Sequence, residues 1–289
     1  MPAFRYHRPA SVDEAVGLLA ELGSDAKILA GGQSLVPLLA LRLSHPEHLI
    51  DIGRVRGLDA IEAGTDGFRI AAAARHADVE LLPAAATAAP LVAAAMPHIG
   101  HRAIRNRGTV CGSLAHADPA AELPAVALAA DAQLVARSST GERTIPAADF
   151  FLGYLTSALD ETEVLTAVHF PPWPERTGWS VQEVSRRHGD YALVGLAAVL
   201  GVGDDGRVER AALSFFGAGS TPVRVPEAEQ VLLGERPDPS AFAEAADVVT
   251  KTIDPPGDNH ATAPYRAHVA GVLTRRCLAE AAGRTGGAS

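Results

Sequence analysis

The sequence predicts an α+β protein of two domains. Up to about residue 170, short apolar segments alternate with helical patterns and glycine turns, a mixture typical of α+β folds. The segment PPWP at 171–174 then interrupts the pattern. Beyond it, strand-like segments come first and helical segments follow, which indicates a separate domain. We therefore expect an N-terminal domain at 1–173, made of units at 1–55 and 56–173, and a C-terminal domain at 174–289.

The first unit is expected to hold three short strands and two helices. Residues 4–7, 26–30 and 48–51 are short segments that favour strands. Ser11 followed by Glu14 is a capping box before a helix with one apolar face. A pair of glycines ends the second strand, and a helix is expected over 35–43, with a proline that is tolerated only in its first turn.

The second unit is expected to be a mostly antiparallel sheet with helices. Residues 58–63 and 68–73 flank a glycine turn and predict a hairpin. Helical patterns follow at 76–82 and 90–96. A second hairpin is expected at 133–138 and 142–145, and a further strand at 164–170. The loop that precedes the second hairpin is expected to lead into a helix, with Asp118 as its cap and Pro119 in its first turn.

The C-terminal domain is expected to contain three strands followed by three helices. The strands are predicted at 179–186, 191–202 and 208–216, and the last two flank a strong Asp-Asp-Gly turn. Helical patterns follow at 225–233, 240–251 and 264–282. The tail at 283–289 is rich in glycine and is expected to be disordered.

Two glycine segments carry the main functional signal. Residues 30–35 read AGGQSL, and residues 104–123 read IRNRGTVCGSLAHADPAAEL. Glycine lets a ligand approach the main chain, and exposed N–H groups at a strand–turn–helix junction bind anions. An ordinary tight turn is the alternative for either segment taken alone. Neither the GxGxxG fingerprint nor a GxxxxGK[ST] loop occurs, so both standard nucleotide motifs are excluded.

The two segments, at this spacing, make the chain resemble the FAD-binding medium subunits of molybdenum hydroxylases. That family includes the flavoprotein subunit of carbon monoxide dehydrogenase and the flavin part of xanthine dehydrogenase. The resemblance extends to FRYHRP at 4–9, RHGDYA at 187–192 and VLTRRCL near the end. It implies an N-terminal FAD-binding domain of the PCMH/vanillyl-alcohol-oxidase-like type and a C-terminal domain with a three-stranded antiparallel sheet and a helix bundle. The family usually has two glycines where this chain has Cys111 and Gly112, so the Cβ of Cys111 is expected to crowd the pyrophosphate.

The resemblance implies an FAD site between the two N-terminal units. Asp118 is expected to hydrogen-bond the flavin half, with helix capping as its alternative, and Glu122 is either a ligand contact or a first-turn helix charge. Tyr191 is expected near the flavin ring, with packing in the core as its alternative, and no catalytic residue is assigned. Arg105 and Arg107 either face phosphate or are solvated. The carried-over cofactor contacts are Ala30, Gly31, Gly32, Gln33, Ser34, Leu35, Arg105, Thr109, Val110, Cys111, Gly112, Ser113, Ala117, Asp118 and Leu123.

The same resemblance implies a role in electron transfer. The FAD subunit would take electrons from a small subunit with two-iron–two-sulfur clusters and pass them to an external acceptor. A large subunit with molybdenum cofactor would oxidise the substrate. Two alternatives stay open: a stand-alone flavin-dependent oxidase, and a module that keeps the fold but has lost FAD. The substrate, the acceptor and the oligomeric state do not follow from the sequence.

The composition of the chain argues against several other classes of protein. A net charge of −9 argues against a nucleic-acid partner. The two cysteines, Cys111 and Cys277, are too few for a disulfide framework or a four-cysteine cluster. The histidines show no metal-binding spacing, so no metal site is predicted. No apolar run is long enough to span a bilayer and no signal peptide is evident, so a cytoplasmic location is expected.

Overall fold

The N-terminal unit is a small parallel sheet with helices. A computed structural model describes residues 3–286. Its first sheet has the order β1-β3-β2, and both pairings are parallel. The Ser11 hydroxyl caps the first helix by accepting from the Glu14 N–H, and the Glu14 carboxylate accepts from the Ala10 N–H. The elements are β1 (Arg5–His7), α1 (Val12–Leu22), η1 (Gly23–Asp25), β2 (Ala26–Leu29), α2 (Leu35–Ala40) and β3 (His48–Asp51).

The middle unit is built on a five-stranded sheet of order β4-β5-β10-β6-β7, antiparallel throughout, as expected. A two-stranded hairpin, β8 with β9, lies outside this sheet. The strands are β4 (Ile61–Gly64), β5 (Gly67–Ala71), β6 (Gln133–Ser138), β7 (Gly141–Pro146), β8 (Phe151–Gly153), β9 (Thr156–Ser157) and β10 (Val164–Phe170). The helices are α3 (His76–Glu80), α4 (Pro83–Ala88), α5 (Pro90–Ala95), η2 (Met96–His98), α6 (Arg102–Arg105), α7 (Val110–His116), α8 (Glu122–Ala129) and α9 (Ala147–Phe150).

The C-terminal part is a sheet covered by helices on one face. Its strand order is β11-β12-β13-β14, antiparallel throughout. The fourth strand is short and was not expected from the sequence. The elements are β11 (Thr177–Ser185), β12 (Ala192–Val202), β13 (Val208–Phe216), β14 (Val223–Arg224), α10 (Pro226–Leu232), α11 (Pro239–Thr252) and α12 (Ala263–Gly283). The tail predicted to be disordered lies partly outside the described residues.

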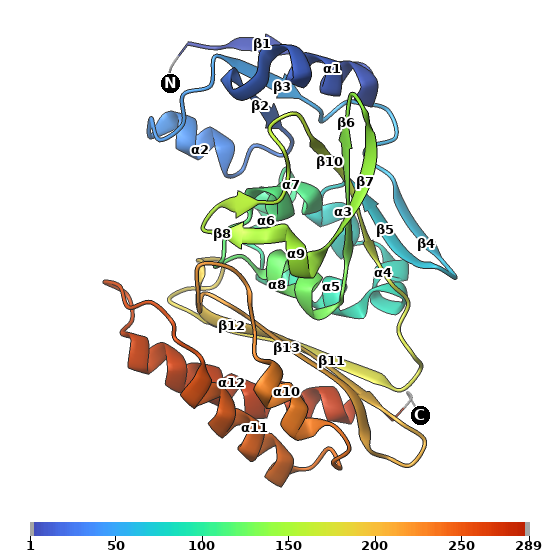
Figure 1. Cartoon of the computed structure of the whole chain (residues 1–289), viewed down its shortest axis with the longest axis vertical. Coiled ribbons are helices and arrows are strands. Elements are labelled where there is room, and N and C mark those ends of the chain that lie inside the picture. Colours follow the sequence, from blue (N-terminus) through green and yellow to red (C-terminus); the bar gives the residue numbers. More distant parts are fainter. Residues whose placement is uncertain (1–2, 287–289) are drawn as a thin grey trace.

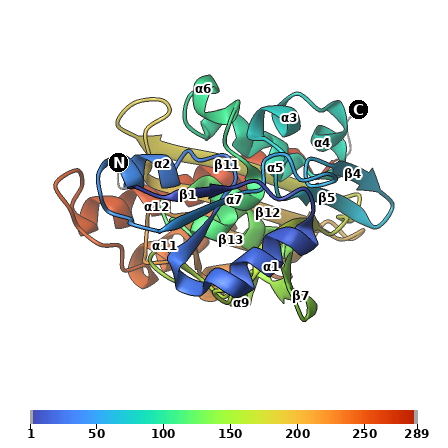
Figure 2. The ribbon, with the colours of Figure 1, turned by 90° about the horizontal axis from the view of Figure 1, so that it is seen from above.

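The C-terminal sheet is buried on both faces and joins the two hydrophobic cores. Alternate residues of β12 point to opposite faces, as strand geometry requires. Leu196 and Leu200 pack into the core with the C-terminal helices, whereas Ala197 and Val199 belong to the core of the middle unit. Figure 1 shows the resulting stack, with the N-terminal unit at the top and the middle unit below it. The C-terminal sheet comes next: α5 and α8 of the middle unit cover one of its faces, and the C-terminal helices cover the other. Figure 2 shows the N-terminal unit from above, lying over the middle unit.

Two local expectations were wrong. The segment after Thr109 is not an open loop: residues from Val110 onward form helix α7. The next helix begins at Glu122 rather than at Pro119, and Asp118 does not cap it. The Asp118 carboxylate instead accepts a hydrogen bond from the Ala120 N–H at 2.9 Å, which closes a side-chain turn before the helix.

Candidate cofactor site

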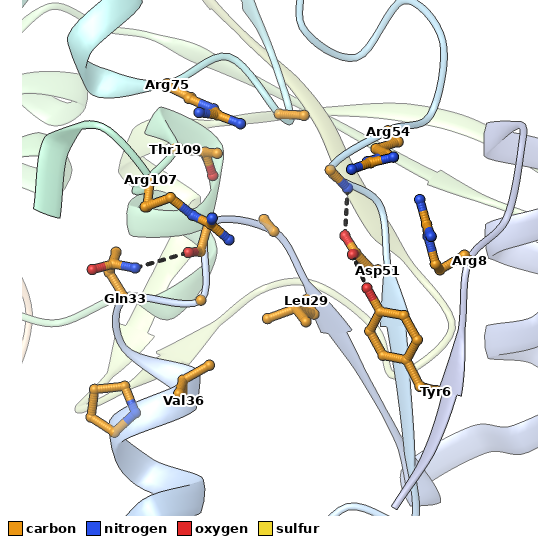
Figure 3. A pocket seen from close by; sticks show the side chains of 16 residues that line it. Tyr6, Arg8, Leu29, Gln33, Val36, Asp51, Arg54, Arg75, Arg107 and Thr109 are labelled. Atoms are coloured by element: carbon orange, nitrogen blue, oxygen red, sulfur yellow. Dashed lines mark hydrogen bonds between the residues drawn. The ribbon is translucent and has the colours of Figure 1, made fainter. Parts of the chain in front are cut away.

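A cavity of about 720 Å³ lies where the three parallel strands of the first sheet end (Figure 3). Parallel strands present their carboxyl ends at one edge, the usual place for a ligand in such sheets. Arg8 follows β1, the Gly31–Gly32 pair follows β2, and Arg54 follows β3. The residues that line the cavity are Tyr6, Arg8, Leu29, Ala30, Gly31, Gly32, Gln33, Val36, Pro37, Asp51, Gly53, Arg54, Ala73, Arg75, Arg107 and Thr109.

The two glycine segments contact each other at this cavity. A Cβ built on Gly31 would lie 2.3 Å from the carbonyl oxygen of Arg107 and 2.7 Å from the Cα of Gly108. Gly32 has a positive φ of 74°, a conformation that glycine adopts without strain. The Gln33 side chain donates to the Gly31 carbonyl at 3.1 Å. Close backbone contact therefore holds the two segments together, and it depends on the missing side chain of Gly31.

The cavity is strongly cationic. Arg75 and Arg107 lie on one side, and Arg8 and Arg54 lie on the other (Figure 3). Within residues 3–286, no carboxylate pairs with any of these four guanidinium groups, although Arg75 donates to the Asn106 carbonyl at 3.0 Å. The one carboxylate on the wall, Asp51, accepts from the Tyr6 hydroxyl and from the Gly53 N–H. Arginine suits phosphate, so the donor set fits a ligand with a pyrophosphate.

The start of α7 fixes the second glycine segment. The Thr109 hydroxyl accepts from the Gly112 N–H at 3.1 Å and caps the helix. Val110 and Cys111 turn their side chains into the core, where they are 0 % and 2 % exposed. The Cys111 thiol donates to the Ile70 carbonyl, and burial raises the pKa of this thiol to about 12. The side chain of Cys111 therefore does not reach the cavity, and the expected crowding of a pyrophosphate was wrong.

Arg105 serves a different purpose from the one expected. Its guanidinium donates to both carboxylate oxygens of Glu80, at 2.8 and 3.0 Å, and to the carbonyls of Ile99 and Gly100. It is 9 % exposed and does not line the cavity. All its interactions thus stabilise the fold around α3 and α6, and the arginine that faces the cavity is Arg107.

The far end of α7 lies in a second polar cluster. Ala117 ends the helix with a left-handed backbone, at a φ of 53°. Asp118 follows, and Tyr191 reaches it from the segment before β12. The pKa of Tyr191 is raised to about 12 by burial and by the charges of the nearby carboxylates of Asp118 and Glu122. Tyr191 is nevertheless 62 % exposed, which excludes its alternative of packing in the core.

The remaining predicted contacts lie around the arginine-lined cavity and the polar cluster of Asp118 and Tyr191. Ser34 is the cap residue of α2, although its hydroxyl makes no capping hydrogen bond, and Leu35 is the first residue of that helix. Gly112 and Ser113 belong to the first turns of α7. Leu123 is 1 % exposed and lies in the core. Within the N-terminal units the structure thus brings together Ala30 to Gln33 and Thr109, whereas Val110, Cys111 and Leu123 contribute packing.

Sequence reasoning missed Tyr6, Arg8, Asp51, Arg54 and Arg75. Three of them follow from one signal that was available. Arg8 directly follows strand 4–7, Asp51 ends strand 48–51, and Arg54 lies three residues beyond Asp51. Had the three predicted strands been placed parallel in one sheet, their carboxyl ends would have brought these side chains beside Gly31. Arg75 lies at the start of α3 and carries no such signal.

The fold and the cavity define a protein that binds an anionic, dinucleotide-sized cofactor between two α/β units. Comparison with known proteins identifies the cofactor. Residues 2–173 match the family model of the FAD binding domain in molybdopterin dehydrogenase, and residues 179–281 match that of the CO dehydrogenase flavoprotein C-terminal domain. The chain belongs to the FAD-binding medium subunits of molybdenum hydroxylases, as the resemblance implied.

Relatives of similar length support this assignment. The chain is 42% identical to the 6-hydroxypseudooxynicotine dehydrogenase complex subunit alpha of Paenarthrobacter nicotinovorans, covering 97% of this chain and 95% of that one. It is 37% identical to the carbon monoxide dehydrogenase medium chain of Hydrogenophaga pseudoflava, covering 96% of both. A solved structure of carbon monoxide dehydrogenase from that organism superposes with a TM-score of 0.94 at 38% identity, covering 98% of each chain. Quinoline 2-oxidoreductase from Pseudomonas putida 86 gives 0.93 at 36%, covering 98% of each chain.

These matches settle the class of the protein. It is a flavoprotein, its cofactor is FAD, and it is part of an oxidoreductase. The expected two-part fold, an FAD-binding domain followed by a C-terminal sheet and helices, is confirmed. In the described part of the chain, no helix has the length and apolar character needed to cross a membrane.

Proposed function

We propose that this chain takes electrons from the iron–sulfur clusters of a partner subunit and passes them through FAD to an external acceptor. The observation that carries the proposal is the pairing of a cationic cavity at one end of α7 with the Asp118–Tyr191 cluster at the other. FAD, when bound, supplies a centre that accepts and releases electrons. The chain itself binds the cofactor, orients its ring and sets the electrostatics around it.

The length of α7, which lies between the two centres, supports an extended FAD. The seven residues of α7 span about 10 Å, since an α-helix rises 1.5 Å per residue. The pyrophosphate would lie in the cavity against Gly31, Gly32 and Thr109, with Arg107 as a charged contact. The flavin ring would lie towards Asp118 and Tyr191. All predicted contacts whose side chains are buried in the core, Val110, Cys111 and Leu123, would then act through the backbone or through packing.

The partners follow from the kind of protein that the relatives are. Those relatives are called medium chains or subunits of complexes, among them carbon monoxide dehydrogenase, nicotine 6-hydroxylase and caffeine dehydrogenase. We infer a large subunit with molybdenum cofactor and a small subunit with two-iron–two-sulfur clusters. Because these relatives match this chain over nearly its whole length while the enzymes are named for different compounds, we infer that the substrate is a property of the large subunit. The division of the chain at residue 173 and a cytoplasmic location stay predictions.

The two alternatives lose their main support. The alternative of a module that keeps the fold but has lost FAD depended on Cys111 crowding the pyrophosphate. The Cys111 side chain points into the core instead. A stand-alone oxidase would need a proton acceptor placed over the flavin with a substrate pocket. The cavity described above is lined by four arginines and suits the proposed pyrophosphate, and no proton acceptor for a substrate has been identified beside it among the described residues.

An absorbance spectrum of the purified chain tests the cofactor, followed by denaturation and identification of the released flavin. About one FAD per chain is expected. Co-expression with candidate large and small subunits then tests the electron path, because the small subunit, once reduced, should bleach the flavin absorbance. Flavin that stays oxidised in an intact complex with reduced clusters would contradict the proposed path. Reduction of the isolated chain by a small organic substrate would favour the oxidase instead.

A further inference from the structure

A buried group of acidic and imidazole side chains lies between the middle unit and the C-terminal sheet. His98 from η2 places its Nδ1 3.6 Å from Oε1 of Glu183 on β11. The Glu183 side chain is only 5 % exposed, and its other oxygen, Oε2, is buried with no hydrogen-bond partner. Glu122, the first residue of α8, is 7 % exposed, and the charges of Glu183 and His98 both act on its carboxyl group. We call His98, Glu122 and Glu183 the junction cluster.

The junction cluster holds more carboxylates than its one cation can neutralise. Burial is the main reason that the pKa of Glu122 is raised to about 7, and the charges of Glu183 and Asp118 raise it further. The pKa of His98 is raised chiefly by the neighbouring carboxylate of Glu183, against the opposing effect of burial. Glu183 has an unpaired, buried carboxylate oxygen, and its charge disfavours ionisation of the second buried carboxyl, that of Glu122. A small change in the local charge therefore suffices to change how many protons the cluster holds.

Few other charged groups face the junction cluster. Asp118 acts on Glu122 from the segment before α8, and Glu122 in turn acts on Tyr191 before β12. His116 on α7 faces Asp118, and burial lowers its pKa. Helix α5 and strand β12 carry no titratable side chain, and Asp149 on α9 is exposed.

The cations on the strands next to α8 are paired elsewhere. Arg210 on β13 binds Asp131 at 2.6 Å. Arg224 on β14 binds Glu229 at 2.6 Å and also donates to the Leu128 carbonyl. In the described residues, no arginine or lysine therefore neutralises Glu122, and proton binding is the route left to compensate a new negative charge there.

We propose that the junction cluster is a redox-linked proton site, which binds one proton from solvent when FAD is reduced and releases it when FAD is reoxidised. The inference rests on the proposed function, which places the flavin ring next to Asp118 and Tyr191. Two electrons arrive from an iron–sulfur donor without protons. At and above neutral pH, FAD that has taken two electrons would bind only one proton, so one negative charge would remain beside the residues that hold the ring. A second proton, bound by the cluster through Glu122, balances that charge, and both protons return to solvent when the acceptor removes the electrons.

The pH dependence of the reduction potential tests this proposal in the full chain with bound FAD. One proton per two electrons gives a slope of about 30 mV per pH unit, and two protons give about 60 mV. The wild-type chain should show the steeper slope in a range that begins near pH 7. Glu122→Gln, which is neutral at every pH, should show the shallower slope there and a more positive potential at pH 9. At pH 6 the two potentials should agree.

Two further variants separate an effect of the junction cluster from a general effect of removing a carboxylate. Glu183→Gln should also reduce the slope, and Glu142→Gln on the exposed strand β7 should leave it unchanged. FAD content is measured first in every variant. A wild-type chain that binds no FAD would overturn the proposed function and this inference together. Full FAD content with the same slope in wild type, Glu122→Gln and Glu183→Gln would overturn the inference alone and leave the proposed function standing.

Discussion

Gly31 is the residue at which the two glycine segments depend on each other. In Gly31→Ala the new Cβ would lie 2.3 Å from a carbonyl oxygen of the second segment, and since backbone atoms cannot rotate away, the segments must separate. We expect the dissociation constant for FAD to rise at least tenfold, which is about 1.4 kcal/mol. Titration of the FAD-free chain, followed by flavin fluorescence, measures the change.

Gly17 provides the control for this substitution. It lies on the exposed face of α1, and a Cβ there would meet no atom within 4 Å. Gly17→Ala should leave FAD affinity unchanged and should stabilise the helix by about 0.5–1 kcal/mol. Equal FAD affinity in Gly31→Ala and Gly17→Ala would show that the contact between the segments does not shape the cofactor site.

Arg105 and Arg107 are two residues apart and should behave in opposite ways. Arg107→Gln removes a charge that faces the cavity, so FAD affinity should fall about tenfold with little change in stability. Arg105→Gln leaves the partly buried Glu80 unpaired and should cost about 3 kcal/mol of unfolding free energy. Urea unfolding and FAD titration of both variants separate the two effects. A loss of FAD affinity confined to Arg105→Gln would restore the contact predicted from the sequence.

At the scale of the element, α7 connects the cavity to the Tyr191 cluster and depends on its cap. Thr109→Ala removes the hydroxyl that accepts from the Gly112 N–H, and such losses cost about 1 kcal/mol. Thr109→Ser keeps this oxygen and should behave like wild type. Urea unfolding of the FAD-free chain compares the three proteins. Equal stability of Thr109→Ala and Thr109→Ser would mean that the cap contributes nothing.

The elements that the sequence predicted best are those specified by local patterns. Strands β3, β6, β10 and β13 have the expected bounds, because alternation and flanking turns are visible in a short window. Helix α7 was missed because its segment, VCGSLAH, has a weak helical pattern. It is helical because Val110, Cys111 and Leu114 are buried against the sheet, and such tertiary packing, rather than propensity, stabilises most short helices.

The site residues that could be predicted are likewise those with a signal in the sequence. The glycine segments could be paired because the spacing of their motifs resembles a known family, which carries tertiary information. Arg107 could not be distinguished from Arg105 because the choice is made by Glu80, 25 residues away in the sequence from Arg105. The positions of Arg8 and Arg54 after predicted strands are visible in the sequence, but only the parallel order β1-β3-β2 brings them to one cavity, and no local pattern encodes that order.

At the scale of the whole molecule, the junction cluster links domain packing to pH. The pKa of Glu122 is raised from 4.5 to about 7 in the folded chain. Because the folded state holds this proton more tightly than the unfolded state, stability is present below pH 4.5 and is lost as the pH rises through 7. The loss amounts to about 3 kcal/mol. His76 acts in the opposite direction, since burial lowers its pKa from 6.5 to about 4, and its contribution is lost as the pH falls.

The contribution of Glu122 can be isolated by subtraction, because His76 is present in both wild type and Glu122→Gln. We expect the FAD-free variant to be as stable as wild type near pH 4.5 and more stable at pH 8. The difference between the unfolding free energies should grow over that range and should level off above pH 7. Urea unfolding at half-unit steps measures it. A difference that is constant with pH would mean that the pKa of Glu122 is the same in the folded and the unfolded chain, and that the junction cluster does not hold its proton at the domain boundary.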